Sequence, residues 1–238
     1  MPYSILCLLL LAAGSDSANF ILKQSDASRF PSDNSKIEIM LETYTDGKLD
    51  SKERLDVYNK GANKSLIKFL ESKRKGHLVL SVDENLWVYF PSARRPIRIT
   101  PIQRILGQAS TGDIARLRYD TDYNPTILRE EILNDRACFV LELTAKSKYS
   151  AYRKIIYWVS KSDFLPRKGD YFLISGKHFK TAYFEDYQQF GRKKLVGGIR
   201  YRSSHKPREE TLIRFLSYTE KSIPEKIFHK NYLNRVRL

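Results

Sequence analysis

The side chains that most often carry catalysis or bind metals are scattered along this chain. Its four histidines have no paired metal-ligand spacing; they are His77, His178, His205 and His229. No Gly-x-Ser-x-Gly nucleophile motif occurs, and "GDYFLISGKH" places His178 where a phosphate-binding loop needs serine or threonine. The adjacent carboxylates Glu130–Glu131 and Glu209–Glu210 would point to opposite faces of a strand. We therefore predict that the protein is not an enzyme and has no catalytic residue, metal or cofactor.

Binding of an anionic group is the chemistry that the composition favours. The formal net charge is +15 and is unevenly placed: residues 1–145 hold 20 basic and 19 acidic side chains, whereas residues 146–238 hold 22 and 8. Such an excess favours nucleic acid, anionic lipid headgroups or an acidic protein; the alternative is a solvated surface. Candidate contacts to an anionic surface gather in residues 191–208, namely Arg192, Lys193, Lys194, Arg200 and Arg202.

The elements that must position these groups show the period-two pattern of strands from Lys36 onward. "KIEIMLETYT" sets Ile37, Ile39 and Leu41 on one face, and "TDGK" at 45–48 is a hairpin-turn signal. Further short segments bounded by Gly, Asp, Asn or Pro continue to "ETLIRFLSY". We predict a mainly β, α+β fold: a single antiparallel sheet of roughly ten strands in one domain.

Three segments break the strand pattern. Residues 100–125 have helix-like spacing at Ile102, Ile105, Leu106, Ile114 and Leu117, with Pro101 in a first helical turn and Gly107 at its end. A short final helix begins at Pro224 and includes Ile227 and Phe228. Residues 19–35 are polar and are expected to form a loose lead-in.

Several middle strands are apolar on both faces, which is unusual for a sheet with one face in water. The predicted helices and a curled sheet could suffice to cover the second face. The other interpretation is a cup for an apolar ligand, in which a sixteen-carbon acyl chain would gain on the order of 10 kcal/mol before entropy costs. The candidate lining of this cup is Val79, Trp87, Tyr89, Val140, Ile156, Trp158, Phe172 and Ile174.

The N-terminus has the pattern of a signal peptide. Ile5 to Ala13 form an unbroken apolar run, too short to span a bilayer, and small residues allow cleavage near residue 14 or 18. An uncleaved anchor is the alternative. Removal of residues 1–18 takes Cys7 away and leaves Cys138 without a disulfide partner. We therefore predict an exported, soluble protein without a lipid anchor.

An ordered series of motifs resembles the bacterial outer-membrane lipoprotein-sorting proteins, the LolA-like and LolB-like group. Residues 58–119 contain Lys-Gly before a Ser-Leu strand, a second Lys-Gly, a Leu-rich strand, Trp-x-Tyr-x-Pro, a basic segment with Arg-Ile, and Gly-x-Ala-Ser-x-Gly-Asp. "VLELTAKSKYSAYRKIIYWV", "SGKHFKTAYFEDY" and the closing "IPEKIFHKNYL" extend the similarity, so residues 36–238 are identified as a domain of this kind.

The resemblance implies an incompletely closed antiparallel β-barrel whose concave apolar face is covered by helices. It also implies a periplasmic carrier of lipoprotein acyl chains or other lipids. The implied partners are an inner-membrane release complex and an outer-membrane acceptor; the basic segment 191–208 adds an anionic membrane surface. In the family an arginine holds the covering helices shut, and Arg94, Arg95 and Arg98 are the candidates for this contact or for headgroups. A lipid-sensing or partner-binding regulator with the same fold, and a basic nucleic-acid-binding β-domain, are the alternatives; export argues against nucleic acid.

Overall fold

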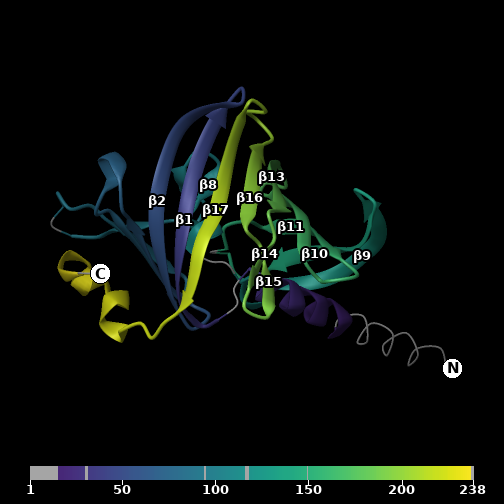
Figure 1. The fold of residues 1–238 in the computed structure, drawn as a ribbon, viewed down its shortest axis with the longest axis horizontal. Coiled ribbons are helices and arrows are strands. Elements are labelled where there is room, and N and C mark those ends of the chain that lie inside the picture. Colours follow the sequence, from purple (N-terminus) through teal and green to yellow (C-terminus); the bar gives the residue numbers. More distant parts are fainter. Residues whose placement is uncertain (1–15, 30–31, 94, 116–117, 149, 237–238) are drawn as a thin grey trace.

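One large antiparallel sheet dominates the computed structural model, which describes residues 16–29, 32–93, 95–115, 118–148 and 150–236. From one edge to the other its 13 strands are β6 (Ile97–Ile99), β5 (Asn85–Tyr89), β4 (Leu78–Val82), β3 (Lys64–Phe69), β2 (Lys48–Lys60), β1 (Asn34–Thr45), β17 (Glu209–Glu220), β16 (Gly198–Ser203), β13 (His178–Glu185), β12 (Pro166–Phe172), β11 (Lys154–Ser160), β10 (Arg136–Ala145) and β9 (Tyr123–Leu133). Among the described residues β6 and β9 do not pair, so the sheet stays open (Figure 1).

The β1–β2 hairpin shows how local sequence sets this sheet. Asp46 and Gly47 have φ angles of 50° and 77°, as a two-residue turn of the type favoured in hairpins requires. The turn fixes a register in which Ile37, Ile39 and Leu41 are all buried on one face. This hairpin, its turn and the mainly β antiparallel class are confirmed. The predicted count of about ten strands is too low, since β9 and the three-residue β6 give weak strand signals.

The predicted loose lead-in is wrong for its first part. Residues 16–27 form a helix, and residues 19–27 of it fall within the segment expected to be irregular. Ala18, Ile21, Leu22 and Ser25 recur at helical spacing and are at most 4% exposed. Abundant Ser and Asp concealed this narrow apolar stripe. The signal-peptide residues 1–15 lie outside the described residues, and its cleavage near residue 14 or 18 stays a prediction.

The helix predicted from Pro101 to Gly107 is also wrong. The chain there forms a turn and a small ladder of β7 (Arg104–Leu106) with β8 (Ala109–Ser110). Gly107 has a φ of +54°, which reverses the chain between the two strands and could not occur inside an α-helix. Within the described part of residues 100–125, helix is confined to α2 (Thr111–Ala115) and α3 (Tyr119–Asp122), so Ile114 alone keeps its predicted helical place, and Leu117 lies outside the described residues.

The remaining elements are short. The predicted C-terminal helix is present as two 3-10 turns after Pro224, η2 (Glu225–Phe228) and η3 (Lys230–Arg235), and a third, η1 (Ser72–Arg74), precedes β4. A separate hairpin pairs β14 (Gln188–Phe190) with β15 (Lys193–Leu195). Within the described ranges, no helix combines the length and the apolar character that crossing a membrane requires.

Candidate functional site

One face of the sheet, called here the inner face, is covered by segments that are not strands. The cover consists of residues 16–27, α2 and α3, and Figure 1 shows the first of these as the purple helix against the sheet. Strands from both halves of the sheet pack with the cover into one core, so the sheet curves around it. The core includes Ile21, Leu22 and Ile114 from the cover and Ile39, Leu41, Leu55, Ile67, Val79, Leu86, Leu141, Leu143, Ile155, Tyr157, Val159, Ile199 and Ile213 from the strands.

Tyrosine side chains fill the middle of the inner face. Tyr119 of α3 meets Tyr157 of β11 edge-to-face, with ring centroids 5.5 Å apart, and its hydroxyl lies 2.6 Å from that of Tyr171. Tyr123, Tyr152 and Tyr201 are buried in the same core. In this closed arrangement the protein's own side chains occupy the inner face, so a ligand would have to displace part of the cover.

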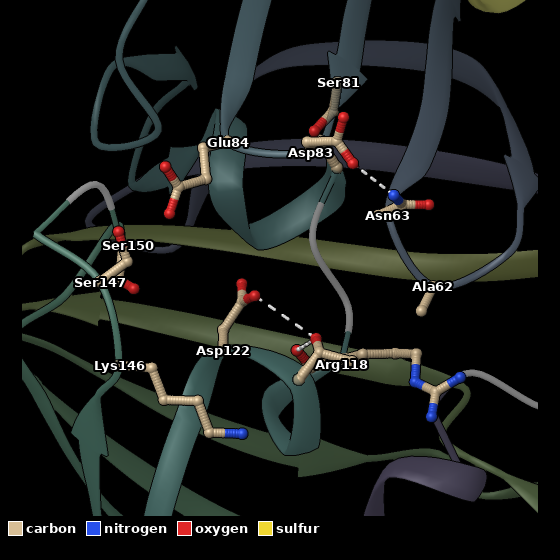
Figure 2. A pocket seen from close by; sticks show the side chains of 12 residues that line it. Ala62, Asn63, Ser81, Asp83, Glu84, Arg118, Asp122, Lys146, Ser147 and Ser150 are labelled. Atoms are coloured by element: carbon tan, nitrogen blue, oxygen red, sulfur yellow. Dashed lines mark hydrogen bonds between the residues drawn. The ribbon is translucent and has the colours of Figure 1, made fainter.

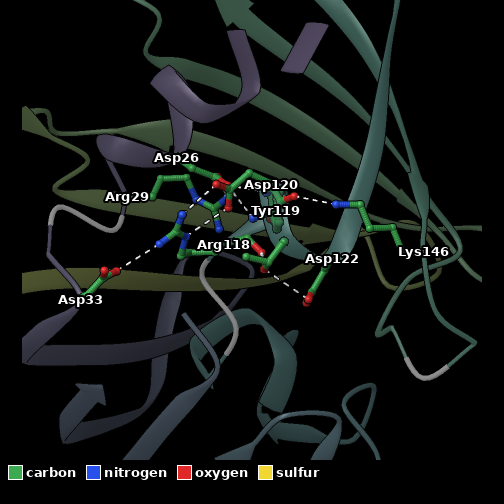
Figure 3. Close-up of polar contacts among 9 residues, drawn as sticks. Asp26, Arg29, Asp33, Arg118, Tyr119, Asp120, Asp122 and Lys146 are labelled. Atoms are coloured by element: carbon green, nitrogen blue, oxygen red, sulfur yellow. Dashed lines mark hydrogen bonds and ion pairs between the residues drawn. The ribbon is translucent and has the colours of Figure 1, made fainter. Parts of the chain in front are cut away.

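The end of the N-terminal helix is attached to α3 by a buried carboxylate. Asp26 Oδ2 accepts hydrogen bonds from the backbone N–H of Tyr119 at 2.6 Å and of Asp120 at 2.7 Å (Figure 3). These are first-turn amides of α3, which lack partners within the helix. Asp26 Oδ1 accepts from the Arg29 guanidinium at 3.2 Å, and that guanidinium lies 3.8 Å from the centroid of the Tyr119 ring. Two hydrogen bonds and one cation–π contact thus join the N-terminal segment to α3, and the Arg29–Asp26 pair holds the carboxylate and the guanidinium together.

Burial and pairing act in opposite directions on this carboxylate. The side chains of Asp26 and Arg29 are each only 3% exposed. Burial raises the pKa of Asp26 to about 7, although the Arg29 guanidinium and two backbone N–H groups lower it. A carboxylate so poorly solvated relies on these partners for its hydrogen bonds. Separating the two parts of the cover would return it to water. A second contact of the helix joins it to the sheet, where Ser25 Oγ lies 3.1 Å from the Tyr157 hydroxyl.

A second buried ion pair holds α2 to the sheet. Lys180 of β13 is fully buried and pairs with the carboxylate of Asp113 in α2. Its ammonium also donates to the Gln108 carbonyl at 2.9 Å and lies 3.9 Å from the centroid of the Tyr201 ring. Asp113 in turn accepts from the Ser110 N–H at 2.6 Å and from the Tyr152 hydroxyl at 2.9 Å. Both charges are thus satisfied inside an otherwise apolar and aromatic core.

A polar cavity of about 350 Å³ lies beside α3 at the mouth of the curved sheet (Figure 2). The β2–β3 turn supplies Asn63, the β4–β5 turn supplies Asp83 and Glu84, and the β10–β11 connection supplies Lys146, Ser147 and Ser150. Arg118 reaches Asp33 at 3.1 Å and Asp120 at 2.8 Å, and Lys146 donates to the Asp120 carbonyl at 2.8 Å (Figure 3). The lining of this cavity is mixed in charge, because it holds Asp83, Glu84 and Asp122 together with Arg118 and Lys146.

The structure separates the eight predicted cup residues. Val79 lies in the inner core. Trp87 and Tyr89 lie on the opposite, outer face, where they pack with Leu80, Ile227 and Leu233. A further outer cluster contains Val140, Trp158 and Ile156. Phe172 is half-buried beside His178, and Ile174 is 77% exposed.

The eight predicted cup residues therefore do not form a single wall. Because both alternating sets are apolar, the pattern could not indicate which set faces inward.

The two predicted arginines that the structure describes, Arg95 and Arg98, lie away from the cover. Arg98 of β6 donates to Asn85 Oδ1 at 2.6 Å, Arg95 is exposed before that strand, and Arg94 lies outside the described residues. Arg29 and Lys180 make the cationic contacts to the cover instead. Of the predicted anionic-surface contacts, Arg200 pairs with Glu185 and Glu210, and Arg202 with Glu210. Arg192, Lys193 and Lys194 are exposed on the β14–β15 hairpin.

In the described chain, no three His, Cys, Asp or Glu side chains gather as they would around a metal ion. The predicted lack of catalytic residues and cofactors stays a prediction.

Comparisons with known proteins define the class. A family model described as that of an uncharacterized protein matches residues 61–235. A LolA superfamily protein from Nitrosomonas europaea is 31% identical with a TM-score of 0.85, over 90% of this chain and 98% of that one. This chain therefore belongs to the LolA superfamily. A comparison with curated proteins finds no match.

Two further structures share the fold at lower identity. A DUF1329 family protein from Desulfovibrio piger is 22% identical with a TM-score of 0.77, over 92% of this chain and 99% of that one. An outer membrane lipoprotein-sorting protein domain from Vibrio parahaemolyticus is 21% identical with a TM-score of 0.75, over 93% of this chain and all of that one.

Proposed function

We propose that this protein is a non-enzymatic periplasmic carrier that shields the acyl chains of lipoproteins, or of other lipids, on their way to the outer membrane. Membership of the LolA superfamily supports this role, and the lipoprotein-sorting domain from Vibrio parahaemolyticus carries that role in its name. The carrier would receive its cargo from an inner-membrane complex and would deliver it to an outer-membrane acceptor.

The observation that carries the proposal is the way the inner face is covered. A broad apolar surface is shielded by a helix and two short helical turns, which are fixed at polar contacts rather than by strand pairing. When the cover opens, water can replace the partners in these polar contacts, and the strand pairing of the sheet stays intact. Withdrawal of the cover would open the core that it shares with the strands, which contains Ile39, Leu41 and Val79, to an acyl chain. Burial of that chain would offset the opening at about 0.8 kcal/mol per methylene.

Native mass spectrometry of the mature protein tests the proposal. We expect a one-to-one adduct with a synthetic diacylated peptide and none with the same peptide lacking its acyl chains. Organic extraction of the purified protein should also release lipid. If the acylated peptide forms no adduct and extraction releases no lipid, the carrier function is refuted. A regulator with the same fold would bind the peptide yet fail to hand it to acceptor vesicles, which separates the two functions.

A further inference from the structure

A second cavity, of about 430 Å³, lies on the outer face beside the C-terminal segment. Cross-strand pairing places Trp87 of β5 directly opposite Arg98 of β6. The turn η3 closes the other side, held by the buried side chain of Leu233. The lining consists of Trp87, Arg95, Pro96, Arg98, Lys230, Asn231 and Asn234. The cavity is thus built by two segments far apart in the chain, and neither belongs to the cover.

The charges around this cavity are of one sign. Arg95, Arg98 and Lys230 line it, and the lining includes no carboxylate. Arg98 is hydrogen-bonded to the neutral amide of Asn85, and Lys230 lies 6.0 Å from the centroid of the Trp87 ring. None of the three cations forms an ion pair within the part of the chain that the structure describes. Arg200 and Arg202, by contrast, are compensated by Glu185 and Glu210.

Three cations around a concave site repel one another unless an anion enters. Two guanidinium groups suit the oxygens of a phosphate, because they donate in a planar fork. The amides of Asn231 and Asn234 add neutral donors. Tryptophan, lysine and arginine together are also the side chains that favour the membrane–water interface.

We propose that this cavity binds the phosphate group of an anionic phospholipid at a membrane surface. The site would hold the outer face of β5, β6 and η3 against the bilayer, while the inner face stays on the other side of the sheet. It does not depend on the proposed acyl-chain binding. The native mass spectrometry experiment and the one below can therefore fail independently.

Vesicle binding and tryptophan fluorescence test the site. The chain has two tryptophans, so a Trp158→Phe background leaves Trp87 as the only reporter. We expect its emission to change with vesicles of phosphatidylglycerol and phosphatidylcholine, but not with phosphatidylcholine alone. The triple variant Arg95→Gln, Arg98→Gln, Lys230→Gln should lose roughly a hundredfold in vesicle partitioning, at about fivefold per charge.

The matched control removes the same charge elsewhere, by Arg192→Gln, Lys193→Gln and Lys194→Gln on the β14–β15 hairpin. It should change partitioning much less, because attraction to the surface falls off within a Debye length of about 10 Å. An equal loss in both variants would overturn the location. A response to inorganic phosphate without vesicle binding would overturn the membrane assignment, and no response to either would overturn the site.

Discussion

Lys180→Met is expected to lower the free energy of unfolding by about 3–5 kcal/mol, because it leaves the Asp113 carboxylate buried without its cation. Methionine fills much of the same volume, so packing changes little. The ammonium contacts to the Gln108 carbonyl and the Tyr201 ring are lost at the same time. Urea denaturation followed by circular dichroism measures the change, provided that the slope with denaturant stays constant.

Two further variants separate charge from packing. Lys177→Met removes an exposed lysine just before β13 and should change stability by no more than about 0.5 kcal/mol. Adding Asp113→Asn to Lys180→Met removes the unpaired charge but keeps a hydrogen-bond acceptor, and it should restore a substantial part of the loss. A Lys180→Met protein as stable as the unaltered chain would show that the buried pair does not hold α2.

Asp26→Ala is expected to tighten binding of the diacylated peptide by roughly 30- to 150-fold. In the closed arrangement the substitution leaves Arg29 and two backbone N–H groups buried without their acceptor, at about 2–3 kcal/mol. Opening returns these groups to water, so a larger fraction of molecules is able to bind. The apparent dissociation constant is the intrinsic one divided by that fraction, so it falls as the fraction rises. A peptide titration by calorimetry measures it, and this prediction rests on the proposed function.

Two graded controls accompany this variant. Ser25→Ala removes one neutral hydrogen bond to Tyr157 and should tighten binding about fivefold, for about 1 kcal/mol. Asp33→Asn removes an exposed ion pair with Arg118 and should change binding less than twofold. If Asp26→Ala binds the peptide no more tightly than the unaltered protein, its contacts do not restrain the cover.

Local sequence predicted the strands well where one face alone is buried. Ile37, Ile39 and Leu41 alternate with Glu38, Met40 and Glu42, and the Asp-Gly turn after them fixes the register, so this hairpin follows from the pattern. Around Leu86 and Trp87 the same reasoning identified two apolar strand faces. It did not indicate which of the two faces belongs to the inner face of the sheet. That choice is made by distant residues, since Leu233 packs on the Trp87 side, whereas Leu86 belongs to the core that includes Ile114 of α2.

The polar contacts of the cover could not be predicted from sequence. Asp26 lies 93 residues from Tyr119, and Lys180 lies 67 residues from Asp113, so no local spacing links them. The resemblance to the LolA-like proteins indicated an arginine at the cover without placing it. The one signal was Lys180 itself, which takes an inward position in β13, two residues before the buried Ala182.

The central claim is that cargo enters beneath the cover, and hydrogen exchange on the diacylated-peptide complex tests it most directly. The backbone N–H groups of Tyr119 and Asp120 donate hydrogen bonds to Asp26 in the free protein. We expect these two amides, together with those of residues 16–27, to exchange faster in the complex. The amides of β1 and β10 should keep their protection. Tightly bound peptide with unchanged exchange throughout the cover would contradict the claim.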